Sequence, residues 1–179
     1  MSWLSRRSWG RRRDDLSAMG TLFTEAERIA RHDGAPEVGA EHLVLAALDL
    51  DDGSADRVLE RVDRTRADLV SAVAQQHAEA LGSVGLAEPD DDEAGALLRR
   101  GRPQRGPHRS APAAHDLFRS VVAQVRQDDS RLTGAAFVLA LAQAPGGVLA
   151  RVVRSLGVDA AALEAAARAE LALLAEQGA

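Results

Sequence analysis

The sequence contains no cysteine, no tyrosine and no lysine, and aromatic residues make up only 3% of it. Without cysteine the chain can form neither disulfides nor thiolate metal sites, and a reducing compartment is its natural setting. With so few aromatics, the core must be built mainly from Ala, Leu and Val, which dominate the 46% of apolar residues. These residues favour closely packed helices over a β-rich fold.

Long apolar runs are also missing. No stretch of about 18 apolar residues is present that could span a bilayer. The first 13 residues hold five arginines and do not resemble the apolar core of a signal peptide. We therefore expect a cytoplasmic protein, and the 179 residues are enough for one domain or for two small helical halves.

Two segments have a composition that disfavours packing. Residues 1–14 carry five arginines without a helical apolar period, which predicts a basic, disordered arm. Residues 82–111 combine three prolines with an acidic run at 90–93 and five arginines. Such a segment cannot bury enough apolar area to offset its ordering entropy, so we predict a flexible charged linker there.

The segments on either side of this linker, 15–81 and 112–179, repeat each other at an offset of 94 residues. Gly39-Ala40-Glu41-His42-Leu43-Val44 lies over Thr133-Gly134-Ala135-Ala136-Phe137-Val138, and the register continues without a gap to Leu69 over Leu163. The apolar spacing in each half is helical, and Gly, Pro and Asp mark the breaks. The sequence predicts helices over residues 15–32, 40–49, 54–62, 65–81, 112–128, 134–143, 147–156 and 159–176.

Two motifs carry a resemblance to a known family. Residues 145–158, which read Pro-Gly-Gly-Val-Leu-Ala-Arg-Val-Val-Arg-Ser-Leu-Gly-Val, and residues 39–45, which read Gly-Ala-Glu-His-Leu-Val-Leu, resemble the Clp N-terminal domain. The resemblance covers about residues 15–177. It implies an all-α fold in which two four-helix repeats form one pseudo-symmetric domain of about eight helices.

In that family the domain recruits substrates or adaptors to a Clp unfoldase, so the resemblance implies a chaperone-associated role in regulating proteolysis. The chain lacks the Gly-x-x-x-x-Gly-Lys-Ser/Thr loop that cradles ATP phosphates. We therefore expect a stand-alone, non-catalytic protein without a cofactor, which captures protein clients or modulates a Clp ATPase. Neither nucleic acid nor a membrane is the expected partner. The alternative is a nucleic-acid-associated protein that binds through its basic arm, with the salt sensitivity of phosphate contacts.

The resemblance also suggests a ligand site. Some family members bind phosphorylated arginine with the Glu that opens the second helix of each half and a Thr near the start of the first. In this chain Glu41 matches the Glu and Ser17 falls where the Thr would be, whereas the second half has Ala135 and Ala111. Ser17 and Glu41 are therefore the predicted phosphoarginine ligands. The alternative is that Glu41 only complements the positive end of its helix.

Metal binding and acyl transfer are not expected from the pattern of residues. No second histidine lies at helical spacing from His42 to complete a zinc pair, and the other four histidines show no ligand pattern. The nucleophile sequence Gly-x-Ser-x-Gly is also missing. The sequence thus predicts neither a metal site nor catalytic residues.

Overall fold

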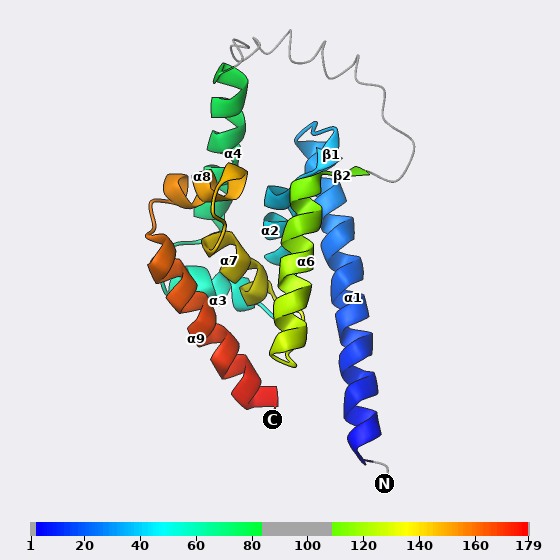
Figure 1. Ribbon diagram of the computed structural model, residues 1–179. Helices are drawn as coiled ribbons and strands as arrows, with labels where there is room; N and C mark the ends of the chain where they lie inside the picture. Colours follow the sequence, from blue (N-terminus) through cyan, green and yellow to red (C-terminus); the bar gives the residue numbers. More distant parts are fainter. Residues whose placement is uncertain (1–2, 84–108, 179) are drawn as a thin grey trace.

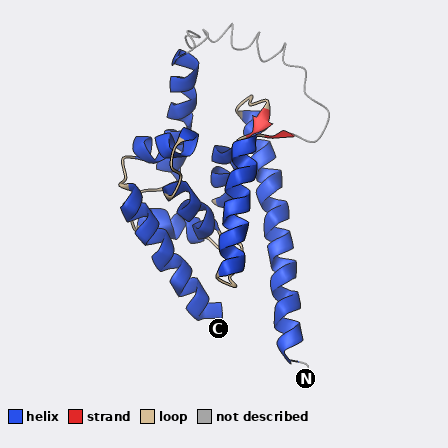
Figure 2. Cartoon of the chain, viewed as in Figure 1, coloured by secondary structure: helices blue, strands red, loops and turns tan. Residues whose placement is uncertain are grey.

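The computed structural model describes residues 3–83 and 109–178, with side chains described for 15–80 and 109–177. Within these ranges the fold is all-α, with eight helices and one pair of two-residue strands (Figures 1 and 2). The helices are α1 (Trp3–His32), α2 (Ala40–Ala47), α3 (Ser54–Glu60), α4 (Arg66–Ser83), α6 (Pro112–Gln127), α7 (Gly134–Ala142), α8 (Gly147–Leu156) and α9 (Ala160–Gly178). The strands β1 (Glu37–Val38) and β2 (Arg109–Ser110) pair in parallel.

The predicted repeat is confirmed by the positions of these helices. Adding 94 to Ala40, the first residue of α2, gives Gly134, the first residue of α7, and the same shift takes the start of α4 to the start of α9. The second half of α1 corresponds in the same way to α6. Most helix boundaries lie within two residues of the predicted ones.

The first helix is the exception, because it begins at Trp3 rather than at residue 15. The predicted basic arm is therefore continuous with α1 in the structure. Extending an existing helix adds one hydrogen bond per residue without a new nucleation step, and Arg and Leu are good helix formers. Of the predicted linker, residues 84–108 lie outside the described part of the chain, while Arg109 and Ser110 form β2.

Local sequence explains where several helices begin and end. Thr65 and Asp68 exchange hydrogen bonds at the start of α4, and Asp159 accepts the backbone N–H of Ala162 at the start of α9. Pro112 occupies the first turn of α6, where its missing N–H costs nothing. Gly157 ends α8 in the left-handed conformation, with a φ of 68°.

Helix α7 lies at the centre of the core, and eight of its nine residues are buried. It packs against α9 of its own half and against α2 and α3 of the other half. Other helices of the two halves also pack against each other: α4 of the first half packs on α8 of the second, and α3 packs on α9 (Figure 1). A Cβ atom at Gly134 would lie 2.8 Å from the carbonyl oxygen of Ala47, so glycine permits this close approach of the halves.

The start of α7 is capped by residues of the other half. Asp52 accepts the backbone N–H of Gly134 at 3.1 Å, and the Ser54 hydroxyl accepts that of Ala135 at 2.7 Å. These N–H groups have no partner within their own helix, so buried acceptors must come from elsewhere. The start of α7 in the second half is therefore completed by side chains of the first half.

A buried carboxylate also joins the two halves. Glu170 of α9 is only 3% exposed and accepts hydrogen bonds from Arg57 at 2.6 Å and from Arg61 at 3.0 Å. Burial acts to raise the pKa of Glu170, but the bonds from the two guanidinium groups outweigh it and hold this pKa below its usual 4.5.

We expect Glu170→Gln to lower the free energy of unfolding by about 2 kcal/mol, because it removes two charge-assisted hydrogen bonds whose arginines are partly exposed. Since the pKa is lower in the folded state, this stabilisation is fully present above pH 4.5 and is lost as the pH falls through the folded pKa. Urea unfolding of the wild type and of Glu170→Gln at pH values above and below 4.5 measures the difference in stability. A difference that stays constant on acidification would contradict the assignment.

No single described helix is long and apolar enough to cross a membrane, although α7 and α8, which are bent by 95° at their junction, pass that test together by length and composition.

Candidate functional site

The structure does not bring Ser17 and Glu41 together. Glu41 lies in the first turn of α2, and its neighbour His42 is 3.7 Å from Asp33, which follows the last residue of α1. Ser17 is exposed on α1, 15 residues before His32. At 1.5 Å per residue this separation corresponds to about 22 Å along the helix, so one arginine side chain cannot contact both residues.

Ser17 and Glu41 are separated because the helices of each half begin next to helices of the other half. Val38 just before α2 pairs with Ser110, and its carbonyl accepts the N–H of Ala111 at 2.9 Å, so the start of α2 lies beside the start of α6. In the equivalent place of the other repeat, Asp15 of α1 accepts the backbone N–H of Leu132, just before α7, at 3.1 Å. Asp15 within α1 thus lies beside the start of α7, and the start of α6 lies beside the start of α2.

This arrangement separates the predicted ligands. Glu41 belongs to the same corner as Ala111, which has no hydroxyl, whereas Ser17 belongs to the corner of Ala135, which has no carboxylate. The N–H of Ala135 is also occupied by Ser54. At the positions that match the family's phosphoarginine site, neither corner therefore has both a hydroxyl and a carboxylate.

The Glu41 carboxylate is already engaged in the folded protein. It folds back over the start of its own helix, where a Cβ atom at Gly39 would overlap it, and its Oε1 lies 3.5 Å from Nε2 of His77 on α4. Burial acts to raise the pKa of Glu41, but hydrogen bonds from His77 and from its own backbone N–H lower it overall. The same bond with Glu41 raises the pKa of His77 against the opposing effect of burial.

His42 is 1% exposed and closes the start of α2. Its Nδ1 accepts the backbone N–H of Gly39 at 2.7 Å, and its ring meets that of His77 edge-on with centroids 5.8 Å apart. Because Nδ1 is an acceptor, the neutral ring carries its proton on Nε2, the atom that faces Asp33. This capping arrangement accounts for a histidine inside the core.

A second candidate site is an apolar groove between α1 and α6. Phe23 of α1 and Phe118 of α6 are in ring contact, with centroids 5.0 Å apart, beside a hollow of about 460 Å³. Buried Leu43 of α2 is part of its lining. The lining residues are Phe23, Leu43, Ser110, Ala114, His115, Phe118, Arg119 and Val122.

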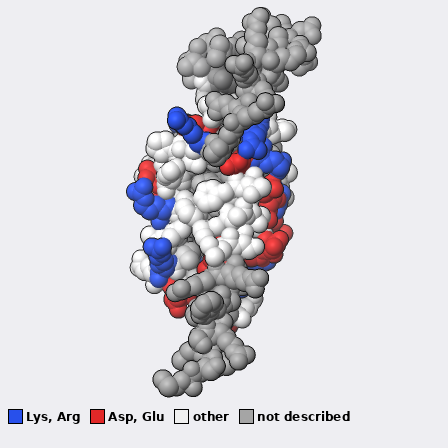
Figure 3. All heavy atoms as spheres, turned by 90° about the vertical axis from the view of Figure 1, so that its right-hand side faces the viewer, with Lys and Arg blue, Asp and Glu red and all other residues white. Residues whose placement is uncertain are grey.

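The surface beside this groove is apolar as well. Leu16 on α1 is 65% exposed and Phe23 is 37% exposed. Figure 3 shows that uncharged side chains fill the middle of the face on the side of α1, while charged ones gather toward its edges. Exposed apolar patches with a charged rim are typical of protein-binding surfaces. Two phenylalanines on amphipathic helices were the available sequence signal for this groove, but sequence alone does not place them together.

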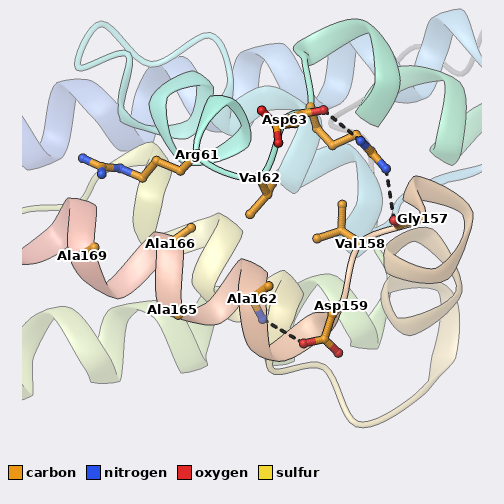
Figure 4. A pocket seen from close by; sticks show the side chains of 11 residues that line it. Arg61, Val62, Asp63, Gly157, Val158, Asp159, Ala162, Ala165, Ala166 and Ala169 are labelled. Carbon is orange, nitrogen blue, oxygen red and sulfur yellow. Dashed lines mark hydrogen bonds between the residues drawn. The ribbon is translucent and has the colours of Figure 1, made fainter.

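A larger, more open hollow of about 690 Å³ lies between the α3–α4 turn and α9 (Figure 4). Arg64 donates there to the carbonyls of Leu156 and Gly157 at 2.8 and 3.1 Å, and Asp159 caps α9. Small side chains of α9, among them Ala162, Ala165 and Ala169, form one wall. Arg64 and Asp159 thus close helix ends, and Arg61 is paired with Glu170, so these polar groups have structural roles.

The crossed helical repeats and the apolar groove define a helical binding module. Residues 18–127 match the family model described as the Clp repeat (R) N-terminal domain, and since this is more than half of the chain, the protein belongs to that family. It is accordingly a protein-binding or adaptor module of the Clp system. The match ends with α6, although α7–α9 continue the same fold. No curated protein matches the sequence.

Proposed function

We propose that this protein captures client proteins for the Clp system, or competes with a Clp ATPase for them, by binding an apolar segment of the client in the α1–α6 groove. Binding occurs without chemical turnover. The observation that carries this proposal is the pair of contacting phenylalanines beside an open apolar hollow on a partly exposed face. Aromatic side chains in such positions dominate the energetics of protein interfaces.

The charges at the groove indicate which segments fit best. Arg119 and His115 of α6 belong to its lining, and Arg119 is an exposed cation. Across a binding surface, opposite charges steer association and suppress wrong partners. We therefore expect a preference for clients whose apolar segment is followed or preceded by acidic residues.

Phosphoarginine is the weaker ligand candidate. A guanidinium would have to displace His77 from Glu41, and no hydroxyl of Ser17 is within reach of the same ligand. If Glu41 does bind phosphoarginine, Glu41→Gln will abolish the binding while groove variants leave it unchanged. The nucleic-acid alternative rests on residues 1–14, whose side chains lie outside the described part of the chain, and deletion of that segment tests it.

Substitution in the groove should weaken client binding. We expect Phe23→Ser to raise the Kd of an apolar peptide flanked by aspartates by about tenfold or more, because the peptide loses an aromatic contact at the groove. Fluorescence anisotropy with the labelled peptide measures this. Val70→Ser on α4 is the matched control, since Val70 is also exposed and does not line the groove. Equal losses in both variants would contradict the assignment of the groove.

A further inference from the structure

Three potential metal ligands meet at the start of α2. Glu41 and His42 come from its first turn and His77 comes from α4, and one side-chain ligand atom of each lies within 4.8 Å of the other two. Oε1 of Glu41 is 3.5 Å from Nε2 of His77 and 3.8 Å from Nδ1 of His42. The tertiary fold creates this group, because His77 is 35 residues further along the chain than His42.

The chemistry and spacing of these atoms suit one small transition-metal cation. Two imidazoles and a carboxylate form a donor set that zinc uses in proteins, with bonds of about 2.0 to 2.2 Å. Tetrahedral bonds of that length place neighbouring donor atoms about 3.4 Å apart. The two distances from Oε1 of Glu41 are within half an ångström of this value. His77 is only partly buried, so its ring has room to move toward His42.

The surroundings supply an outer ligand shell as well. Because Nδ1 of His42 accepts the Gly39 N–H, Nε2 carries the proton of the neutral ring and lies 3.7 Å from Oδ2 of Asp33. A carboxylate behind a ligating histidine is the usual way to fix its tautomer and orientation. The backbone N–H of Gly39 uses the same Nδ1, so a cation competes with that hydrogen bond and with the protonation of His77.

We propose that Glu41, His42 and His77 form a binding site for Zn²⁺ or a similar divalent transition metal, with Asp33 as the outer partner of His42. Three protein ligands leave the fourth tetrahedral position to water. A bound ion joins α4 to the start of α2, next to the β1–β2 pair. The proposal is independent of the groove, since none of these residues lines it.

Titration of Zn²⁺ into tag-free full-length protein, followed by calorimetry above the pH range in which imidazoles titrate, tests the site. We expect one ion per chain. His77→Gln and Glu41→Gln each lose a ligand and should weaken binding more than about tenfold, and Asp33→Asn should weaken it by about 10- to 100-fold. Glu176→Gln is the matched control and should bind like the wild type, since Glu176 is exposed on α9 and belongs neither to the groove lining nor to the three ligands.

The visible spectrum of bound Co²⁺ provides a second measurement. It reports metal ligands directly and would not change if His77 had only a structural role. The visible absorption of Co²⁺ bound to the wild type should be that of a tetrahedral ion with nitrogen ligands, and it should be absent in His77→Gln. Circular dichroism checks that the His77→Gln variant is folded, as expected for a residue that is only partly buried. Absence of stoichiometric binding by the wild type, or equal affinity of His77→Gln and Glu176→Gln, would overturn the proposal.

Discussion

A chain that ends at Gln127 should not fold, even though it contains every residue matched by the family model. Such a chain lacks the almost fully buried α7, together with α8 and α9, which pack on α4 and α3. Burying one large aliphatic or aromatic side chain contributes about 1.5–3 kcal/mol. The large side chains lost include Phe137, Leu141, Leu156 and Leu163, all of them buried.

Together these four side chains contribute about 6–12 kcal/mol, which is as large as the stability expected for a whole domain of this size, about 5–15 kcal/mol. The truncation would also uncover the remaining helices, since α2 and α3 pack on α7, α3 packs on α9 and α4 packs on α8. We expect the truncated chain to show weak helical circular dichroism and no cooperative urea transition, whereas residues 1–179 unfold cooperatively. A cooperative transition in the truncated chain would show that the first repeat is an independent domain.

The helices of this fold were largely predictable, because amphipathic spacing and local breaks determine them. The boundaries of α8 were predicted to the residue, and those of α6 and α7 to within one. The start of α1 was not predicted correctly, since an arginine-rich sequence without an apolar period does not indicate whether a helix continues.

The arrangement of the halves was harder to predict. The offset of 94 shows that α2 and α7 are equivalent, but a repeat is compatible with helices that pack within one half or across both. The pairing of Ser17 with Glu41 assumed the first arrangement, and the Val38–Ser110 and Asp15–Leu132 contacts show the second. Likewise, the approach of His77 to Glu41 depends on how α4 is placed against α2. The spacing of residues along a single helix cannot reveal that His77 and Glu41 lie close together.

Phe137→Ala should be the most destabilising single substitution considered for this protein, with a loss of about 3–5 kcal/mol in the free energy of unfolding. Phe137 is 0% exposed and lies in α7, where both halves meet. Its removal leaves a cavity that the surrounding helices cannot fill, because their other contacts, such as the close approach of Gly134 to Ala47, hold them in place. Urea unfolding monitored by circular dichroism measures the loss.

The repeat itself supplies the matched control for this substitution. Leu43 occupies the equivalent position in the first half and is equally buried. Phe137→Leu therefore places the residue of one half in the other, keeps most of the apolar volume and should cost less than about 1.5 kcal/mol. A loss that is similar for both substitutions would mean that the aromatic shape at the centre of α7 matters more than its volume, and that the two halves are not packed equivalently around the pseudo-symmetry axis.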